Sequence, residues 1–406
     1  MIKKIILSII ALCLIWSHAA QANFFDGKQK YYTVKTEHFS IHFPQELGPV
    51  AEEMKTITEE TYNRIVNRLE WQPWGRTHVV LSDKTEEANG LSLVLPYDYI
   101  LLYVVPPEAD STLDDYKDYL RLLFTHEFTH IVHIDMHYRW ATPGRYLFGK
   151  FDAPNGATPG WVREGLAVYE ESELVPGFGR NNSAATDMYI RTAIYENKFP
   201  RIDQITGVSL QFQGPDGAYL FGGKFFDWLS DTYGEDRLYK FEKEYASGFW
   251  VFSLNNKARR VFGKSFYKLW EDFKAEETQK YDSQRAELTK QGLTEFEPVI
   301  QTNDTQGAFV PRPGTDGFAY YQTSFDDGNK IIIKPDAQSK ELHLARNLFG
   351  QMSFSATGRY LAFASLGTLN PKTSYADVYY YDVTEKKLQR VADAEHTKTS
   401  MRAKDP

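Results

Sequence analysis

Leu120-Arg-Leu-Leu-Phe-Thr-His-Glu-Phe-Thr-His130 joins local structure and chemistry more closely than any other run in this chain of 406 residues. Its apolar residues recur at helical spacing, and it ends in an H-E-x-x-H pattern. Residues four apart lie on one face of a helix, so His126 and His130 can present imidazole nitrogens to the same ion. We therefore predict a buried helix that supplies two ligands to a Zn²⁺ ion.

Glu127 is the candidate catalytic base. It follows His126 directly, and the helical turn rotates it away from the ligand face. Its carboxylate is therefore expected beside a zinc-bound water rather than on the ion. Zinc lowers the pKa of such a water towards about 7, and a nearby carboxylate can then accept its proton.

A catalytic zinc needs a third protein ligand. The metzincin pattern H-E-x-x-H-x-x-G-x-x-H would take it from the same segment. Here His133 stands where glycine is required, Met136 stands where histidine is required, and His137 is one residue out of register. The third ligand must therefore come from elsewhere in the chain.

Pro159-Gly-Trp-Val-Arg-Glu-Gly-Leu-Ala-Val-Tyr-Glu-Glu171 offers that ligand 34 residues after His130. Its Trp161–Ala167 core resembles the W-x-x-E-G-x-A element of aminopeptidase-like gluzincins, the peptidase MA group. The resemblance implies that Glu164 is the third ligand of one zinc ion per chain. It also implies that Gly165 and Ala167 are small so that two helices can pack closely.

The resemblance extends over about residues 23–285. The segment Glu37–Phe43 with the following helix looks like the opening of such domains, and Ala218–Phe226 is similar to their A-Y-x-x-G-x-x-F helix. The implied fold is α+β, with a small sheet and a helical lobe. Tyr219 of that helix could donate its hydroxyl to the oxyanion of the reaction, or it could simply pack the helix against the core.

Other polar residues near the motif have a functional and a structural interpretation. His133 and His137 continue the histidine stripe, and a packing role is favoured over a second metal site. Asp135 could orient a ligand histidine. Glu170 and Glu171 are expected on a solvated face.

Two further features stay open at this point. Arg163 could bind a substrate carboxylate or form an ordinary surface ion pair. The apolar strand predicted over Tyr99–Val105 could line the cleft as an edge strand and pair with an extended peptide, or it could lie inside the sheet.

The remaining periodicity gives a coarse map of the first domain. Strands are expected in the ranges 31–43, 78–81 and 99–105, and a capping box at Ser111–Asp114 is expected to open the helix of the H-E-x-x-H motif. Further helices are expected at about 47–69, 161–172, 184–197, 217–232, 235–246 and 264–280.

The first 22 residues have the pattern of a secretory signal peptide. Two lysines precede the apolar run Ile5–Trp16, and Ala20-Gln-Ala22 is a cleavage pattern. The apolar run is too short to span a bilayer. We therefore expect a periplasmic or secreted protein with no transmembrane segment after cleavage.

Residues 288–406 read as short strands with turns between them. The run Ser353–Ser365 followed by Ala376–Val383 is similar to part of one blade of a TolB-like β-propeller, and a degenerate copy spans about 309–335. About two blades fit here, so the propeller is expected to be incomplete and the chain to be a fragment of a longer protein. A small β-sandwich is the alternative.

Three domains are thus predicted: a signal peptide (1–22), a zinc metallopeptidase-like domain (23–287) and a partial propeller (288–406). The formal charge of −8 argues against a nucleic-acid partner. The expected activity is hydrolysis of peptide bonds in a peptide or protein substrate, and the propeller could bind an envelope protein. The alternatives are a propeller-based periplasmic binding or adaptor protein, and a zinc hydrolase that acts on a non-peptide bond.

Overall fold

The structure is a computed structural model. It describes residues 29–392 apart from 86–87, 108–117, 152, 175, 208–215, 249–250, 295–296, 301, 303, 325 and 371–372. The predicted signal peptide (1–22) and the predicted capping box (111–114) lie outside the described residues, and the three domain boundaries stay predictions.

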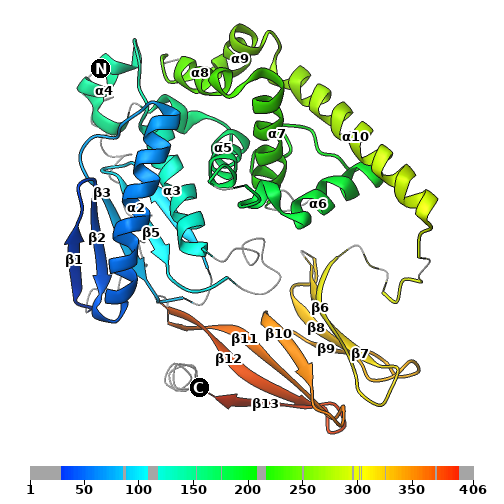
Figure 1. Cartoon of the computed structure of the whole chain (residues 1–406). Helices are drawn as coiled ribbons and strands as arrows, with labels where there is room; N and C mark the ends of the chain where they lie inside the picture. The colour runs from blue at the N-terminus through cyan, green and yellow to red at the C-terminus, as the bar shows by residue number, and fades with distance from the viewer. Residues whose placement is uncertain are drawn as a thin grey trace, which may run out of the picture.

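A five-stranded mixed sheet forms one side of the first part of the chain (Figure 1). Its spatial order is β1-β2-β3-β5-β4, with β2, β3 and β5 parallel and the two outer pairs antiparallel. The expected strand at 31–43 is in fact a hairpin of two strands. The bounds are β1 Tyr31–Lys35, β2 Phe39–Pro44, β3 Thr77–Ser82, β4 Gly90–Leu93 and β5 Tyr99–Tyr103.

Two long helices, α2 (Gly48–Leu69) and α3 (Tyr119–Asp135), pack side by side against this sheet (Figure 1). The aromatic rings of Phe39, Phe124 and Phe128 meet between β2 and α3, with ring centroids 5.4–5.7 Å apart. These rings are fully buried. The apolar face of α3 packs against the sheet. This contact determines which face of the helix points away from the sheet.

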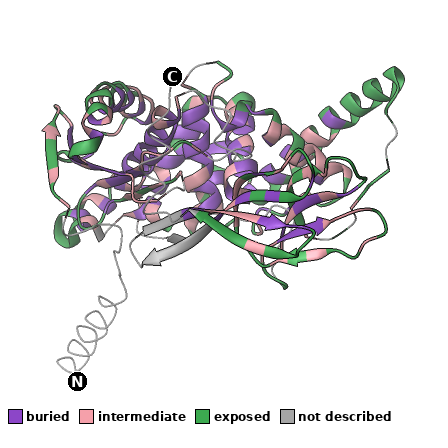
Figure 2. Cartoon of the chain, turned by 90° about the horizontal axis from the view of Figure 1, so that it is seen from below, coloured by how far each residue is buried: buried purple, intermediate pink, exposed green. Residues whose placement is uncertain are grey.

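Most of the remaining first part is a helical lobe. Helices α4 and α9 were not predicted, and α10 extends well beyond its expected end, with an exposed outer half that is visible in Figure 2. The helices are α4 Ala141–Phe148, α5 Gly160–Ser172, α6 Ala184–Tyr195, α7 Gly217–Tyr233, α8 Glu235–Tyr245, α9 Leu254–Phe262 and α10 Phe266–Gln291.

Helices α5 and α7 cross at a contact between two glycines. A Cβ atom on Gly165 would lie 2.8 Å from the backbone of Gly222, and one on Gly222 would lie 2.8 Å from the carbonyl oxygen of Trp161. Only glycine allows so close an approach. The E-G-x-A and A-Y-x-x-G elements of the sequence thus meet each other in space.

The described residues after α10 form two four-stranded antiparallel meanders, each in sequential order, and no closed propeller is formed among them (Figure 1). Ile333, Leu361 and Phe363 belong to one buried cluster that the two sheets share. The strands are β6 Thr305–Pro311, β7 Phe318–Thr323, β8 Lys330–Lys334, β9 Leu342–Leu344, β10 Leu348–Phe354, β11 Tyr360–Asn370, β12 Thr373–Asp382 and β13 Lys387–Ala392. Across the described residues, no helix combines the length and the apolar character needed to cross a bilayer.

Candidate metal centre

Helix α3 carries the H-E-x-x-H motif. Its first turn is capped by Asp118, whose side chain accepts a hydrogen bond from the backbone N–H of Arg121 (3.2 Å). The His126 and His130 rings lie edge to face with centroids 4.8 Å apart. Both side chains are almost wholly buried and line one cleft, as their spacing predicts.

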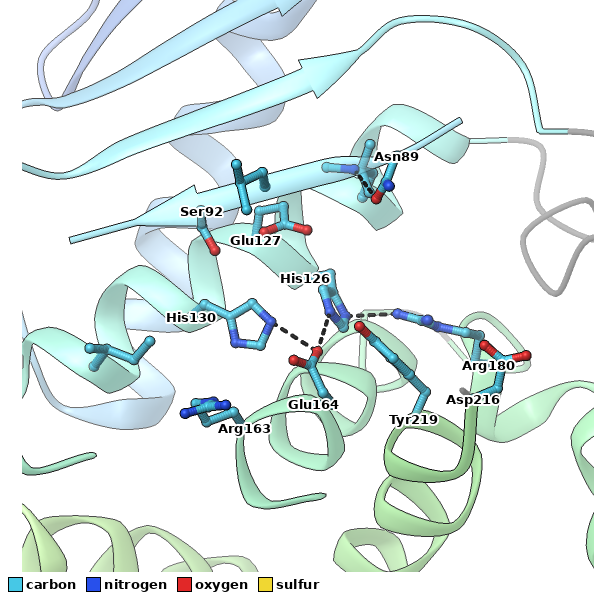
Figure 3. Close-up of a pocket in the computed structure, with 14 residues that line it drawn as sticks. Asn89, Ser92, His126, Glu127, His130, Arg163, Glu164, Arg180, Asp216 and Tyr219 are labelled. Atoms are coloured by element: carbon cyan, nitrogen blue, oxygen red, sulfur yellow. Dashed lines mark hydrogen bonds and ion pairs between the residues drawn. The ribbon is translucent and has the colours of Figure 1, made fainter. Parts of the chain in front are cut away.

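Glu164 reaches the two histidines from helix α5. Its Oε2 atom lies 3.3 Å from Nε2 of His126 and 3.2 Å from Nε2 of His130 (Figure 3). The close crossing of α5 and α7 at Gly165, the next residue, holds this part of α5 in place. His126, His130 and Glu164 therefore offer three ligand atoms that all lie within 4.8 Å of one another.

The donor set and its geometry fit a zinc ion. Two imidazole nitrogens and one carboxylate oxygen are a ligand set typical of catalytic zinc. Ligands about 2.0–2.1 Å from a tetrahedral ion lie roughly 3.3 Å from each other, and both nitrogen–oxygen distances here match that value. The cluster can thus hold a metal such as zinc.

The electrostatics of the cluster also favour a cation. Burial would raise the pKa of the Glu164 carboxyl, but attraction to His130 and hydrogen bonds from both imidazoles lower it overall. Burial and Arg180 would lower the pKa of His126, but the carboxylates of Glu164 and Glu171 raise it to about 9. Negative charge at Glu164 and Glu171 therefore surrounds the imidazole on two sides.

A second carboxylate, Glu171, contacts the far nitrogen of His126. Its Oε2 atom lies 3.1 Å from Nδ1 of His126, and Arg180 binds both of its oxygens at 2.7 and 2.9 Å. Burial would raise the pKa of Glu171, but the Arg180 guanidinium lowers it to about 2, so the carboxylate is ionised.

The expectation that Glu170 and Glu171 face solvent is wrong. Both side chains are fully buried, and Glu170 accepts hydrogen bonds from Arg68 (2.6 Å) and Tyr239 (2.7 Å). Arg180, which no sequence pattern indicated, lies nine residues after Glu171 in the short helix η4 (Arg180–Asn182). The one available signal was a Glu-Glu pair directly after the run Leu166-Ala-Val-Tyr169.

The cluster opens into a cleft of about 640 Å³ between β4, α3, α5 and α7 (Figure 3). Glu127 lies in this cleft beneath β4, beside the histidines and not among the three clustered ligands. A Cβ atom on Gly90 would lie 2.8 Å from Oε1 of Glu127, so glycine in β4 makes room for the carboxylate.

Tyr219 lies on the cleft wall, from the first turn of α7. Its ring stacks on His126 with centroids 5.8 Å apart, and the Arg180 guanidinium lies 5.0 Å from its ring centroid. Burial, and then the nearby carboxylate of Glu164, raise the pKa of the Tyr219 phenol. The hydroxyl is therefore a neutral donor at neutral pH, as an oxyanion role would need.

The remaining candidates of the motif helix lie outside the cluster. His133 forms a fully buried hydrogen bond with Glu242 (2.7 Å), and the His137 ring packs edge-on against Trp71. Asp135 pairs with Arg145 and accepts a hydrogen bond from Trp71 (3.1 Å), so it does not orient a ligand histidine. These contacts fit the packing interpretation of both histidines.

The strand next to the cleft is β4, and not β5, which corresponds to the strand predicted over Tyr99–Val105. β5 lies inside the sheet between β3 and β4, whereas β4 is the edge strand. Asn89, Gly90, Leu91 and Ser92 of the β4 segment line the cleft. β4 is only four residues long, so the alternation of Leu91, Ser92 and Leu93 is too short to reveal it.

The described residues thus define an α+β protein with a His/His/Glu site that can take a metal ion such as zinc. No family model matches the chain. A protein of Treponema pallidum (strain Nichols), named "Uncharacterized protein", is 25% identical over 360 residues, which are 86% of this chain and 31% of that protein. The chain therefore spans about a third of the length of this relative.

Two solved structures show a distant similarity to the chain. Leukotriene A4 hydrolase from Saccharomyces cerevisiae matches with a TM-score of 0.37 and 12% identity, over 57% of this chain and 36% of that chain. An aminopeptidase N family protein from Idiomarina loihiensis matches with a TM-score of 0.35 and 11% identity, over 90% of this chain and 66% of that chain. The chemistry of the site is therefore drawn from its own residues.

Proposed function

We propose that the protein is a zinc-dependent hydrolase of peptide bonds. One observation carries the proposal: the His126/His130/Glu164 cluster lies at the bottom of an open cleft, with the carboxylate of Glu127 beside it. The separation of ligands from base is what hydrolysis needs, because the base must keep a free oxygen for proton transfer.

Each residue of the cleft has a distinct part in this proposal. His126, His130 and Glu164 would hold the zinc, which when bound polarises a carbonyl group and makes a water molecule more acidic. The Glu127 carboxylate accepts a proton from the attacking water and then donates it to the leaving amine. The Tyr219 hydroxyl donates a hydrogen bond to the carbonyl oxygen as negative charge develops there.

The edge strand β4 favours an extended peptide as the substrate. Among the described residues β4 pairs only with β5, so its outer backbone N–H and C=O groups face the cleft side without a ladder partner. A peptide laid along this edge would add one strand to the sheet and bring a backbone carbonyl over the cluster.

The first test is metal content, measured by elemental mass spectrometry on wild type and on Glu164→Ala. We expect about one zinc per wild-type chain and a marked loss in the variant. A peptide-library screen then asks for cleavage, with Glu127→Gln as the matched inactive control that keeps the ligands. Absence of zinc after reconstitution at neutral pH would sink the proposal.

The screen also separates the alternatives. Zinc-loaded protein that cleaves no peptide would favour a hydrolase of a non-peptide bond. Protein that binds no zinc would favour a binding or adaptor role.

We further propose that the protein is exported to the periplasm or beyond, on the pattern of residues 1–22. We also propose that the two meanders are propeller blades that bind an envelope protein.

A further inference from the structure

We infer that Arg163 binds a carboxylate of the substrate, so that the cleft selects acidic peptides. This inference rests on the proposed function and names the substrate class of the same site. The carboxylate is that of an acidic side chain of the peptide.

Arg163 is held in place at the cleft wall. Its Nη1 atom donates a hydrogen bond to the carbonyl oxygen of Gly156 (2.8 Å), in the short helix η3 (Pro154–Ala157). That helix is tied to α3, because the fully buried Asn155 donates a hydrogen bond to the His133 carbonyl oxygen (2.9 Å). The guanidinium is thus positioned before any ligand arrives, which lowers the entropic cost of binding.

Of the other charged groups of the cleft, Asp216 lies on the opposite side of Glu164 from Arg163, and the rest are already engaged. Glu127 is the base, Glu164 is a ligand, and Arg180 is neutralised by Glu171 at 2.7 Å. In the part of the chain that the structure describes, Arg163 forms no ion pair, so the surface ion-pair interpretation finds no support there. Only Nη1 of its guanidinium donates a hydrogen bond to the described residues, so other N–H groups remain available for a ligand. A planar guanidinium binds a carboxylate with two parallel hydrogen bonds.

The place of Arg163 in the cleft indicates which part of the substrate it meets. Figure 3 shows Arg163 on the His130 side of Glu164, whereas Tyr219, Arg180 and Asp216 lie on the other side. β4 runs from Asn89 towards Ser92, so its carboxyl end lies on the Arg163 side (Figure 3). A peptide antiparallel to β4 would bring residues on the amino side of the scissile bond to Arg163.

The test uses blocked octapeptides of alanine in which a single Glu is moved from position to position, each paired with the Gln peptide. A third arm is an all-alanine peptide with a free carboxyl terminus, paired with its amide. Binding is measured by fluorescence anisotropy on metal-free Glu127→Gln protein, and cleavage is measured on zinc-loaded wild type. Arg163→Gln is compared with Arg201→Gln, which alters an exposed arginine that is paired with Asp203 (2.9 Å).

We expect at least one Glu peptide to bind roughly tenfold to a hundredfold more tightly than its neutral partner. The free-terminus peptide should bind no more tightly than its amide, because the carboxyl end of a peptide antiparallel to β4 lies on the side of the cleft away from Arg163. Arg163→Gln should bring that ratio close to one, and Arg201→Gln should leave it unchanged. A ratio near one in the protein with Arg163 intact, or the same ratio after Arg163→Gln, would overturn the inference. Selective binding without any cleavage would uphold the inference while contradicting the proposed function.

Discussion

At the residue scale, the surroundings of His126 determine which nitrogen is free to bind a metal. Its Nε2 atom faces Glu164, and its Nδ1 atom lies 3.1 Å from the ionised carboxylate of Glu171 and 2.8 Å from Nη2 of Arg180. A proton on Nδ1 can be donated to Glu171, which leaves the lone pair of Nε2 for the ion. Arg180 fixes Glu171 through two hydrogen bonds, so the orientation of the ligand depends on a residue that does not touch the ion.

Glu171→Gln should therefore weaken metal binding without removing a ligand. The amide keeps the shape of the side chain, but it accepts a hydrogen bond more weakly and leaves Arg180 without its counter-charge. We expect zinc affinity to fall roughly tenfold to a hundredfold, as measured by competition with a chromogenic chelator. Glu173→Gln changes an exposed neighbour and is the control; equal affinities for the two variants would contradict this role of Glu171.

At the scale of elements, the site depends on how closely β4, α3, α5 and α7 approach one another. Two glycines set these approaches: Gly90 leaves room for Glu127 under β4, and Gly165 allows α5 to meet Gly222 of α7. In both places a side chain would collide with backbone or with the carboxylate. The geometry of the cluster is thus a consequence of element packing as much as of the ligands themselves.

Gly165→Ala tests the helix crossing. The added methyl group would lie 2.8 Å from the backbone of Gly222, so α5 and α7 must move apart, at a cost of about 1–3 kcal/mol. We expect a lower Tm and weaker zinc binding, because Glu164 moves with α5. Gly207→Ala is the control, since nothing lies within 4 Å of its added Cβ; an unchanged Tm in Gly165→Ala would contradict the close crossing.

The elements also show what the sequence could predict. Helical periodicity located α2, α3, α5 and α7, and the spacing of His126 and His130 predicted that their side chains point the same way. The edge strand β4 escaped because a strand of four residues has almost no periodicity. Glu171 and Arg180 escaped because charged residues predict exposure unless their partners are known, and those partners lie on other elements.

At the scale of the whole molecule, one extensive core joins the mixed sheet to the helical lobe, and the two meanders share a separate, smaller core. Local patterns predicted strands in both regions and the repeat in the second. Two sheets alone do not predict whether a propeller closes, because each blade of a propeller packs against a neighbouring blade on both sides. Thermal unfolding of the protein therefore reports mainly on the stability of the first, larger core.

Asp227 gives that core a defined dependence on pH. Burial raises the pKa of its carboxyl to about 6, although Lys224 opposes the shift. The folded protein therefore holds this proton more tightly than the unfolded chain does. The resulting stabilisation is complete below the ordinary pKa of about 3.8 and is lost as the pH rises through about 6.

Asp227→Asn should remove this dependence, because asparagine stays neutral. We expect the Tm of the variant to exceed that of wild type by about 2–6 °C at pH 8 and to match it closely at pH 4, in differential scanning calorimetry. Asp282→Asn alters an exposed aspartate of α10 and should shift Tm equally little at both pH values. A Tm difference for Asp227→Asn that does not change between pH 4 and pH 8 would contradict the raised pKa. It would show that this carboxyl ionises freely in the folded protein and that α7 is more open to water around Asp227 than its packing indicates.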